Sequence, residues 1–267
     1  MCTLIVVRNG YRHYPLVVAA NRDELLDRPS EPPRVWEQEP RILAPLDAQR
    51  GGTWIGVNGR GVFAAVTNRH DVLSVRGKDS RGELALIALD SACASEALER
   101  VRRLDMRRYN GFHLVIADQR EAWLAYGDGE RAAREEARVE PLPDGIHVIS
   151  NLGAGPDHAE RARNVLHMFR KARLDADAPH VSGFDRVLTF HDDERHVVGS
   201  GTKSMGSVCI HRPKEENYGT RSSAFIRLRT DWNGEPPTWL YRHRERPDDG
   251  FNCNAGWQPE LLLPILS

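Results

Sequence analysis

Short β-rich segments separated by turn residues recur along the chain, and this pattern predicts antiparallel hairpins. In the first hairpin the apolar run 3–7 returns as 16–20 after a turn that opens at Asn9 and Gly10. Runs of the same kind predict further strands at 53–57, 62–67, 112–117, 122–126, 146–149, 208–211, 223–228 and 238–242. Hairpins therefore make up most of the expected structure.

Helical patterns are fewer and fall between the hairpins. Ser80 and Glu83 have the spacing of a capping box and precede a leucine-rich run, which predicts a helix. Further helices are predicted at about 95–103 and 156–174, the latter with one apolar stripe. The proline-rich segment 28–45 is predicted to be an extended surface connection. Hairpins with helices between them indicate an α+β fold of layered sheets.

The composition narrows the classes of function without selecting one. The chain has 267 residues, 40% of them hydrophobic, with 37 basic and 38 acidic side chains and a formal net charge of −1. Nucleic-acid and membrane-surface proteins depend on a sustained basic field, so this balance argues against both. Apolar runs are far shorter than the ~18 residues of a membrane span, and no signal peptide is recognisable. We therefore expect a cytoplasmic protein with a single domain over residues 1–267.

Metal, disulfide and haem motifs are missing from the sequence. Four cysteines are too few and too widely spaced for a disulfide scaffold. No C-x-x-C pair is present, and the charged segment 191–196 is interpreted as a solvated loop, so no metal site is expected. The arginines from Arg100 to Arg108 are interpreted as a solvated helix end, with an acidic ligand group as the alternative. There is no C-x-x-C-H motif, although a histidine such as His13 or His113 could ligate haem.

The second residue carries the main candidate chemistry. Methionine aminopeptidase acts before small residues, so removal of Met1 would expose Cys2 as the first residue. A thiol beside its own free α-amine is a nucleophile with a built-in base, because such an amine has an ordinary pKa near ~7.7–8.0. Cys2 is therefore the candidate nucleophile.

The first hairpin would deliver charged residues to this thiol. If the turn is centred within 9–14, Cys2 lies opposite Asn21 and next to Arg22 and Asp23. An arginine beside a thiol favours the thiolate, and an aspartate can hold the α-ammonium in place. The alternative is that Cys2 is an inert, unprocessed strand residue and that the charged residues form a solvated strand end.

An ordered set of short motifs makes the sequence recognisable. They are Met1-Cys-Thr3, Ala20-Asn-Arg-Asp-Glu24, Gly51-Gly-Thr-Trp-Ile-Gly-Val-Asn58, Gly61-Val-Phe-Ala-Ala-Val-Thr-Asn-Arg69, Ser80-Arg-Gly82, Tyr109-Asn-Gly-Phe112, Ile149-Ser-Asn151 and Tyr218-Gly-Thr-Arg-Ser-Ser223. In this order, over about residues 1–230, the set resembles the NRDE family, also called the transport and Golgi organisation protein 2 family. The resemblance implies the fold of the N-terminal-nucleophile hydrolases, a four-layer αββα sandwich, which agrees with the hairpin pattern.

Within that superfamily the site resembles that of cysteine amidases acting on penicillin V and on conjugated bile acids. The resemblance implies a catalytic set of Cys2, Arg22, Asp23, Asn68, Asn151 and Arg221, with Asn21 and Arg69 as candidates for substrate binding. Cys2 would attack an amide carbonyl and its α-amine would move the proton. The asparagines would hold the oxyanion or orient the amine. No metal or cofactor is implied.

Two features depart from the amidase pattern. Arg22 and Asp23 are adjacent here, whereas the bile-acid amidases separate the corresponding two residues. Neighbours on a flat strand point to opposite faces, so one of them can face away from Cys2. After Asn151 the chain continues Leu-Gly-Ala-Gly-Pro156, where the family has a Pro-Trp element.

From the resemblance we predict hydrolysis of a non-peptide C–N amide bond in a small acyl amide. The alternative is a non-catalytic protein that handles haem or an acyl-CoA-like lipid ligand on the same fold.

Overall fold

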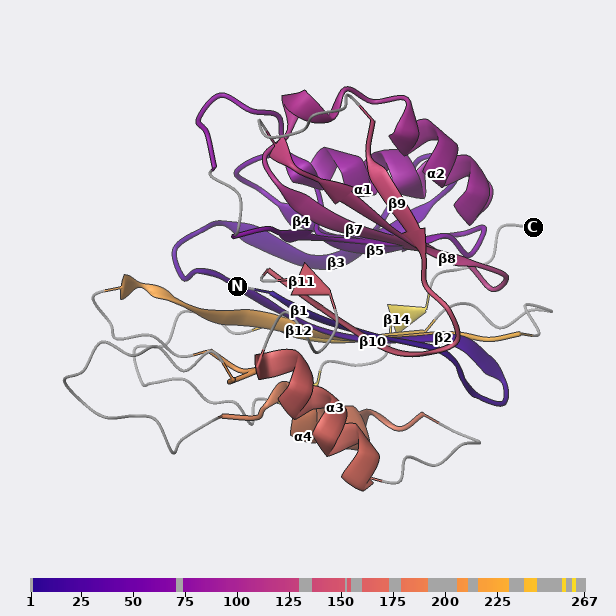
Figure 1. Cartoon of the computed structure of the whole chain (residues 1–267), viewed down its shortest axis with the longest axis vertical. Coiled ribbons are helices and arrows are strands. Elements are labelled where there is room, and N and C mark those ends of the chain that lie inside the picture. Colours follow the sequence, from indigo (N-terminus) through magenta and orange to yellow (C-terminus); the bar gives the residue numbers. More distant parts are fainter. Residues whose placement is uncertain are drawn as a thin grey trace.

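Two antiparallel sheets are stacked face to face, and a pair of helices covers the outer face of each sheet (Figure 1). The computed structural model describes residues 2–70, 74–129, 136–151, 153–154, 160–172, 179–191, 206–210, 216–230, 238–243, 256–257 and 261–262. Within these residues each sheet has seven strands. The expected α+β class, with its four αββα layers, is confirmed.

The two sheets take their strands from different parts of the chain. The first sheet has the order β11-β10-β1-β2-β12-β13-β14. It consists of β1 (Thr3–Tyr11), β2 (Tyr14–Leu25), β10 (Gly145–Ser150), β11 (Gly153–Ala154), β12 (Tyr218–Leu228), β13 (Thr238–His243) and β14 (Leu261–Leu262). The second sheet follows chain order, with β3 (Ser30–Trp36), β4 (Ile42–Asp47), β5 (Ile55–Asn58), β6 (Phe63–Asn68), β7 (Phe112–Ala117), β8 (Ala122–Gly127) and β9 (Arg138–Pro141).

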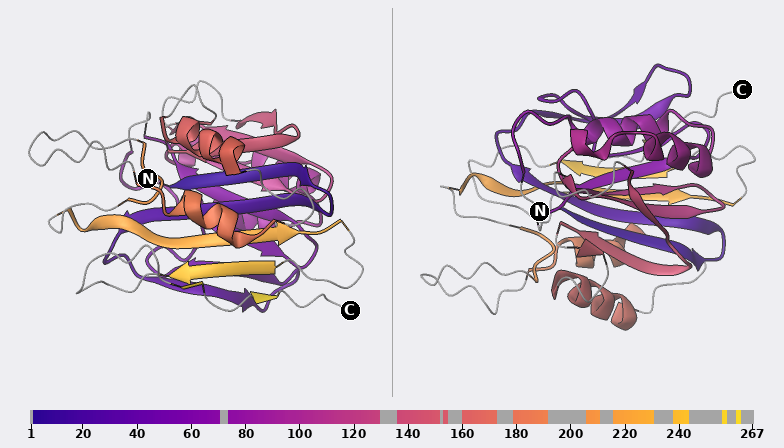
Figure 2. Two further views of the ribbon diagram at one scale, coloured as in Figure 1. Left: turned by 90° about the horizontal axis from the view of Figure 1, so that it is seen from below. Right: turned by 45° about the horizontal axis from the view of Figure 1, so that its top comes forward.

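Each sheet has its own helical cover. On the second sheet lie α1 (Arg81–Leu89) and α2 (Ala94–Arg102), which are followed by the short 3-10 helix η1 (Met106–Arg108). On the first sheet lie α3 (Glu160–Ala172) and α4 (Val181–Leu188). Figure 2 shows the two helix pairs on opposite sides of the stacked sheets.

Strand alternation assigns the side chains of β1 and β2 to two separate cores. Leu4 and Val6 are buried between the sheets, whereas Ile5 and Val7 pack under α3 and α4. Burying one such side chain contributes roughly 1.5–3 kcal/mol, so both faces of the strand resist a change of register. At the start of β1 and from residue 16 along β2, even-numbered positions face the other sheet and odd-numbered positions face the helices.

The first hairpin turns later than the sequence pattern predicts. β1 and β2 pair with Thr3 opposite Asn21, and the register shifts once before the turn. Asn9 has a φ of 48° and lies in this bulge, so it does not open the turn. The chain turns at Arg12 and His13, since Tyr11 pairs with Tyr14, and the bulge recovers only one of the two residues by which this later turn shifts the pairing. The predicted pairing of Cys2 with Asn21 is therefore wrong, and Cys2 is next to Arg22 in the register.

Two predicted segments also differ from the structure. The segment 28–45 contains β3 and most of β4, and its residues 42–45 are buried. Pro32 and Pro33 do not prevent strand formation because β3 is an edge strand, where proline is tolerated. The described residues 208–210 form no strand, since the Val208 and Cys209 amides donate to the Phe190 carbonyl instead. The last residue of that predicted strand lies outside the described residues.

The helices follow the predictions more closely. Those expected after Ser80 and at 95–103 are confirmed as α1 and α2. Within 156–174, α3 is present, and the flanking residues 156–159 and 173–174 lie outside the described ones. Ser80 precedes α1, but its side chain makes no capping hydrogen bond, so the capping box is wrong as a contact. The eight-residue α4 is too short for the pattern to indicate.

Charged segments are largely paired where the structure describes them. In the predicted basic helix end, Arg100 pairs with Asp90 and Arg102 pairs with Glu99, as expected of a solvated face. Residues 192–196 of the predicted solvated loop lie outside the described residues. Across the described ranges, no helix has the length and apolar character needed to cross a bilayer.

Candidate active site

Cys2 immediately precedes β1, which lies between β10 and β2 in the first sheet. β1 pairs with both neighbours as far as Thr3. Continued by one residue, these registers place Asn151, at the end of β10, and Arg22, on β2, on either side of Cys2. The next strand, β12, adds Arg221 in a bulge opposite Arg22. Four of the predicted catalytic residues thus share one row across four neighbouring strands.

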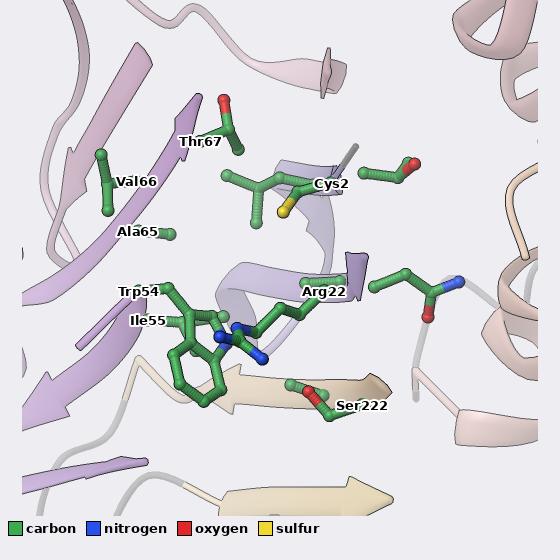
Figure 3. A pocket seen from close by; sticks show the side chains of 13 residues that line it. Cys2, Arg22, Trp54, Ile55, Ala65, Val66, Thr67 and Ser222 are labelled. Carbon is green, nitrogen blue, oxygen red and sulfur yellow. The ribbon is translucent and has the colours of Figure 1, made fainter. Parts of the chain in front are cut away.

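The two faces of this row separate the predicted residues. Cys2 and Arg22 point into the space between the sheets, where both line the same pocket (Figure 3). Asn21 points the other way, and its carboxamide donates to the Leu188 carbonyl of α4 at 2.8 Å. Asp23 lies on that face too. Asp23 is therefore the member of the Arg22–Asp23 pair that faces away from the thiol.

Two hollows meet at Cys2. One is a narrow slot between the sheets with a free volume of about 20 Å³ and apolar walls that include Ile55 and Ala65. The other is an open cleft of about 520 Å³ lined mainly by polar and charged side chains, among them Asn68. Cys2 and Arg22 line both. A carbonyl carbon at this junction would have an apolar region on one side and a polar region on the other.

The Cys2 thiol is partly buried, and its Sγ lies 4.0 Å from the backbone carbonyl oxygen of Asp23. Burial raises the pKa of the thiol, the Asp23 charge adds to this rise and the Arg22 guanidinium opposes it. The resting group is therefore a thiol that needs a base to accept its proton before it can act as a nucleophile.

Arg22 is held by the opposite sheet. Its guanidinium carbon lies 4.2 Å from the centroid of the Trp54 ring. On its own strand, Nη2 is 3.9 Å from Glu24 Oε2. Its Nη1 is buried without a hydrogen-bond partner among the described residues. A buried donor without a partner costs about 1–3 kcal/mol. This nitrogen is therefore suited to bind an anion that forms beside Cys2.

Asp23 belongs to a buried network under the helices. Its Oδ1 accepts a hydrogen bond from Thr220 Oγ1 at 2.6 Å, and its Oδ2 is 3.8 Å from Arg161 Nη1. Arg161 also donates to Thr3 Oγ1 at 3.1 Å. Burial raises the pKa of Asp23 to about 6, although Arg161 and the Thr220 hydroxyl oppose this shift. The network joins α3 and β12 to the start of β1.

Asn151 and Arg221 are buried polar residues at the two ends of the row. Asn151 is 1% exposed, and within the described part of the chain neither atom of its carboxamide has a hydrogen-bond partner. Arg221 is also buried, and its pKa is lowered by burial and by the nearby charge of Arg22. Each side chain therefore carries polar capacity that the surrounding fold does not use fully.

The remaining predicted residues differ in position. Asn68 is exposed and lines the cleft with Cys2. Arg69 instead forms an ion pair with Asp128 beyond the end of β8, and it does not line the cleft. The Asn21 carboxamide is satisfied by carbonyls and by the Ser223 hydroxyl, which donates to it at 2.7 Å. The structure thus lines one cleft with Asn68 and Cys2, and it holds the Asn21 carboxamide and the Arg69 guanidinium in contacts elsewhere.

Comparison with known proteins identifies the family of the sequence. A family model described as Transport and Golgi organisation 2 matches residues 1–235. The chain belongs to this family. It is 34% identical over 245 residues to the Transport and Golgi organization protein 2 homolog of Bos taurus, and the match covers 85% of each chain. The homolog of Homo sapiens is 37% identical over 153 residues, which are 55% of this chain and 52% of the human protein.

The fold of this chain is similar to that of a solved structure. An N-acylethanolamine-hydrolyzing acid amidase ortholog of Caenorhabditis elegans superposes with a TM-score of 0.58 at 13% sequence identity. The match covers 84% of this chain and 92% of that one. The fold is therefore that of the N-terminal-nucleophile hydrolases, as the motifs imply.

Several residues of the site could not be predicted from the sequence by looking only for a nucleophile and its base. Trp54, Arg81 and Thr220 lie inside the recognised motifs, which are the only signal that marks them. Arg161 lies on α3, more than 130 residues from Asp23 in sequence, and no local pattern points to it. Its role depends on how α3 packs on the first sheet.

Proposed function

We propose that this protein is a cysteine amidohydrolase that uses Cys2, after removal of Met1, to cleave a non-peptide C–N bond in a small acyl amide. The observation that carries the proposal is the row across four strands. In this row the Cys2 thiol and the buried Arg22 meet at the junction of an apolar slot and a polar cleft. On the other side of Cys2 in the register is the Asn151 carboxamide, which is buried without a hydrogen-bond partner among the described residues. These are the groups that acyl transfer requires.

The first half of the reaction would form a thioester. The α-amine of Cys2 accepts the thiol proton, and Sγ attacks the carbonyl carbon of the substrate. The tetrahedral intermediate then collapses, the C–N bond breaks, and the α-ammonium gives its proton to the leaving amine. Burial raises the pKa of the thiol and keeps it protonated at rest, so the α-amine of the same residue would have to remove the thiol proton.

The second half would return the enzyme to its starting state. The α-amine accepts a proton from water, and the resulting hydroxide attacks the thioester carbonyl. The C–S bond breaks, the carboxylic acid leaves, and the proton returns to the Cys2 sulfur. No redox partner or metal takes part in either half.

The neighbouring polar groups would stabilise the charges that develop. The Arg22 guanidinium lies beside the sulfur, and the Asn151 amide is available to donate to the oxyanion. Such a donor contributes on the order of 10²–10³ in rate where it has been measured. Asn68 would orient the substrate or the α-amine from the cleft, and Arg221 would add positive charge at the far end of the row.

Asp23 and Asn21 would support this row from below. Through Arg161 and Thr220, the Asp23 carboxylate holds α3 and β12 against the start of β1 and adds negative charge near the α-ammonium. Asn21 fixes β2 to α4. We assign both as positioning residues, and we place the reaction in the reducing cytoplasm, where the thiol stays reduced.

The alternative is a protein that binds haem or an acyl-CoA-like ligand without turnover. Of the candidate haem ligands, His113 is buried, with its ring centroid 5.4 Å from that of Tyr126 and Nδ1 3.4 Å from Thr67 Oγ1. His13 is exposed in the first hairpin. Neither histidine lines the slot or the cleft. The site geometry therefore favours the hydrolase.

The decisive experiment measures processing and turnover together. Intact-mass measurement should show that Met1 is removed, and a panel of acyl amides should be hydrolysed by the wild type. Cys2→Ala should lower turnover by a factor on the order of 10³ or more, whereas Cys93→Ala, at the other partly exposed thiol of the described residues, should not change it. An acyl-enzyme adduct should appear on the peptide that begins with Cys2.

Two outcomes would overturn the proposal. Retained Met1 would block the α-amine and remove the base. Equal rates for the wild type and Cys2→Ala would exclude the thiol as nucleophile. A haem-induced absorbance change that survives Cys2→Ala, together with equal rates, would favour the alternative.

A further inference from the structure

The cleft outside the thiol has an excess of positive charge. Its basic lining residues are Arg22, Arg28, Arg50, Arg76, Lys78 and Arg81, and its acidic ones are Glu24, Asp47 and Asp79. The protein as a whole has a formal net charge of −1, so this excess is a local property of the cleft. A concave surface lined by one sign of charge focuses the field and attracts an opposite charge.

The acidic residues of the cleft are already committed. Asp47 Oδ2 lies 2.6 Å from Arg28 Nη2, and Glu24 Oε2 lies 3.6 Å from Arg28 Nη1. Asp79 Oδ2 lies 2.6 Å from Nη2 of Arg108, which is not a lining residue of the cleft. All three carboxylates therefore have cationic partners, and the partner of Asp79 lies outside the cleft.

Three arginines in the cleft have no such partner among the residues that the structure describes. Within the described ranges, no ion pair involves Arg50, Arg76 or Arg81. The Arg50 guanidinium donates to the Lys78 carbonyl at 2.9 Å, and Arg76 is exposed. Arginine is well suited to bind a carboxylate or phosphate through two parallel hydrogen bonds.

Arg81 is the best placed of the three. It is the first residue of α1, it is partly buried, and its Nη1 donates to the Gly111 carbonyl at 3.0 Å. Burial lowers its pKa, and negative charge on Cys2 would raise it again, so the two groups sense each other. The N-terminal end of α1, with Ser80 and Gly82, also faces the cleft and adds the positive end of the helix dipole.

We propose that this cleft binds an anionic group on the amine side of the substrate, with Arg81 as its main ligand. The inference builds on the proposed hydrolase function. The scissile carbonyl would lie at Cys2 with the acyl part at the mouth of the apolar slot, and a carboxylate or phosphate would occupy the cleft. The substrate class is thus an acyl amide whose leaving amine carries a negative charge.

Binding to Cys2→Ala tests this class without requiring turnover. The probes are three hexanoyl amides with the same acyl chain: those of ethanolamine, glycine and O-phosphoethanolamine. By titration calorimetry at low salt, we expect the two anionic amides to bind at least ~10-fold more tightly than the neutral one. The stronger of the two identifies carboxylate or phosphate as the preferred group. The preference should weaken as salt is raised.

Two variants test whether the preference for anionic amides arises in the cleft. Arg81→Gln in the Cys2→Ala background should reduce the anionic advantage about 10-fold and leave ethanolamide affinity unchanged. Arg12→Gln removes the same charge from the exposed turn at the far end of β1, and it should have no effect. Equal affinities for the three amides, no binding of any of them, or an equal loss in Arg12→Gln would overturn the inference.

The two proposals can fail separately. If the wild type hydrolyses the ethanolamide as fast as the anionic amides and Cys2→Ala binds them equally, the hydrolase stands and the anion site falls. If Cys2→Ala binds anionic amides through Arg81 but the wild type cleaves none of them, the anion site stands and the hydrolase falls.

Discussion

Arg22 lies over Trp54, with its guanidinium carbon 4.2 Å from the ring centroid, and this contact joins the two sheets at the wall of the thiol pocket (Figure 3). Arg22 comes from β2 in the first sheet, and Trp54 immediately precedes β5 in the second. The ring holds one face of the guanidinium and leaves the buried Nη1 without a protein hydrogen bond among the described residues. The positive charge is therefore fixed in position and available to the sulfur.

Arg22→Gln should raise the pKa of the Cys2 thiol, because the Arg22 charge stabilises the thiolate. The rate of alkylation of Cys2 by iodoacetamide at pH 8, followed on its peptide by mass spectrometry, should fall several-fold. Arg34→Gln is the matched control, since Arg34 lies over Trp36 at 5.5 Å on the edge strand β3. An equal effect of both variants would contradict the prediction.

Asn151→Leu should stabilise the protein while it impairs catalysis. The Asn151 carboxamide is buried with no partner among the described residues, so an apolar replacement of similar size should add about 1–3 kcal/mol to the free energy of unfolding. The same change should lower turnover by on the order of 10²–10³ if the amide binds the oxyanion. Urea unfolding and amide hydrolysis measure the two effects.

Asn58→Leu is the control for that pair of effects. Asn58 is equally buried, but its Nδ2 donates to the Leu89 and Ser91 carbonyls and its Oδ1 accepts from two amides. Its replacement should destabilise the protein. If Asn151→Leu destabilises it to a similar extent, the Asn151 carboxamide has structural partners and is not held for a ligand.

Close backbone packing at the start of α1 should contribute more to the free energy of unfolding than the predicted Ser80 cap. Ser80 makes no side-chain cap, so Ser80→Ala should change the free energy of unfolding by less than the ~1 kcal/mol of an ordinary cap. A Cβ on Gly82 would lie 2.9 Å from the Thr53 carbonyl oxygen, so Gly82→Ala should cost about 1–3 kcal/mol. Thermal or urea unfolding of the two variants tests this order, and a larger effect of Ser80→Ala would contradict it.

The sequence was most informative where its signals are local. Alternation along β2 implies that Arg22 and Asp23 cannot share a face, and the structure places Asp23 under the helices. The register was wrong by one residue because Asn9, which can open a turn, lies in a bulge instead, and the chain turns only at Arg12 and His13. A count of residues around the turn cannot distinguish these two uses.

Long-range partners could not be predicted for a different reason. Arg161 reaches Asp23 only because α3 packs on the first sheet, and Thr220 reaches it only through the pairing of β12 with β2. Such contacts depend on tertiary packing rather than on spacing in the chain. The motif set marked Thr220 as a member of a block, but it gave no signal for its bond to a carboxylate.

Asp23 should make the protein less stable as the pH rises through about 6. Burial raises the pKa of Asp23 to about 6, whereas an unfolded aspartate titrates near 3.8. Between these values the folded protein holds the proton that the unfolded chain has lost, so the free energy of unfolding falls with increasing pH. The contribution is complete below the unfolded pKa and lost above the folded one, and it is on the order of 3 kcal/mol.

Urea unfolding between pH 3.5 and 8 measures this slope, with three proteins compared. Asp23→Asn should remove the decrease assigned to Asp23, whatever its effect on absolute stability through Arg161. Thr220→Val removes a hydrogen bond that lowers the Asp23 pKa, so it should move the decrease to higher pH. If Asp23→Asn follows the wild-type profile in parallel, Asp23 ionises without cost in the folded protein and does not carry the proposed buried charge.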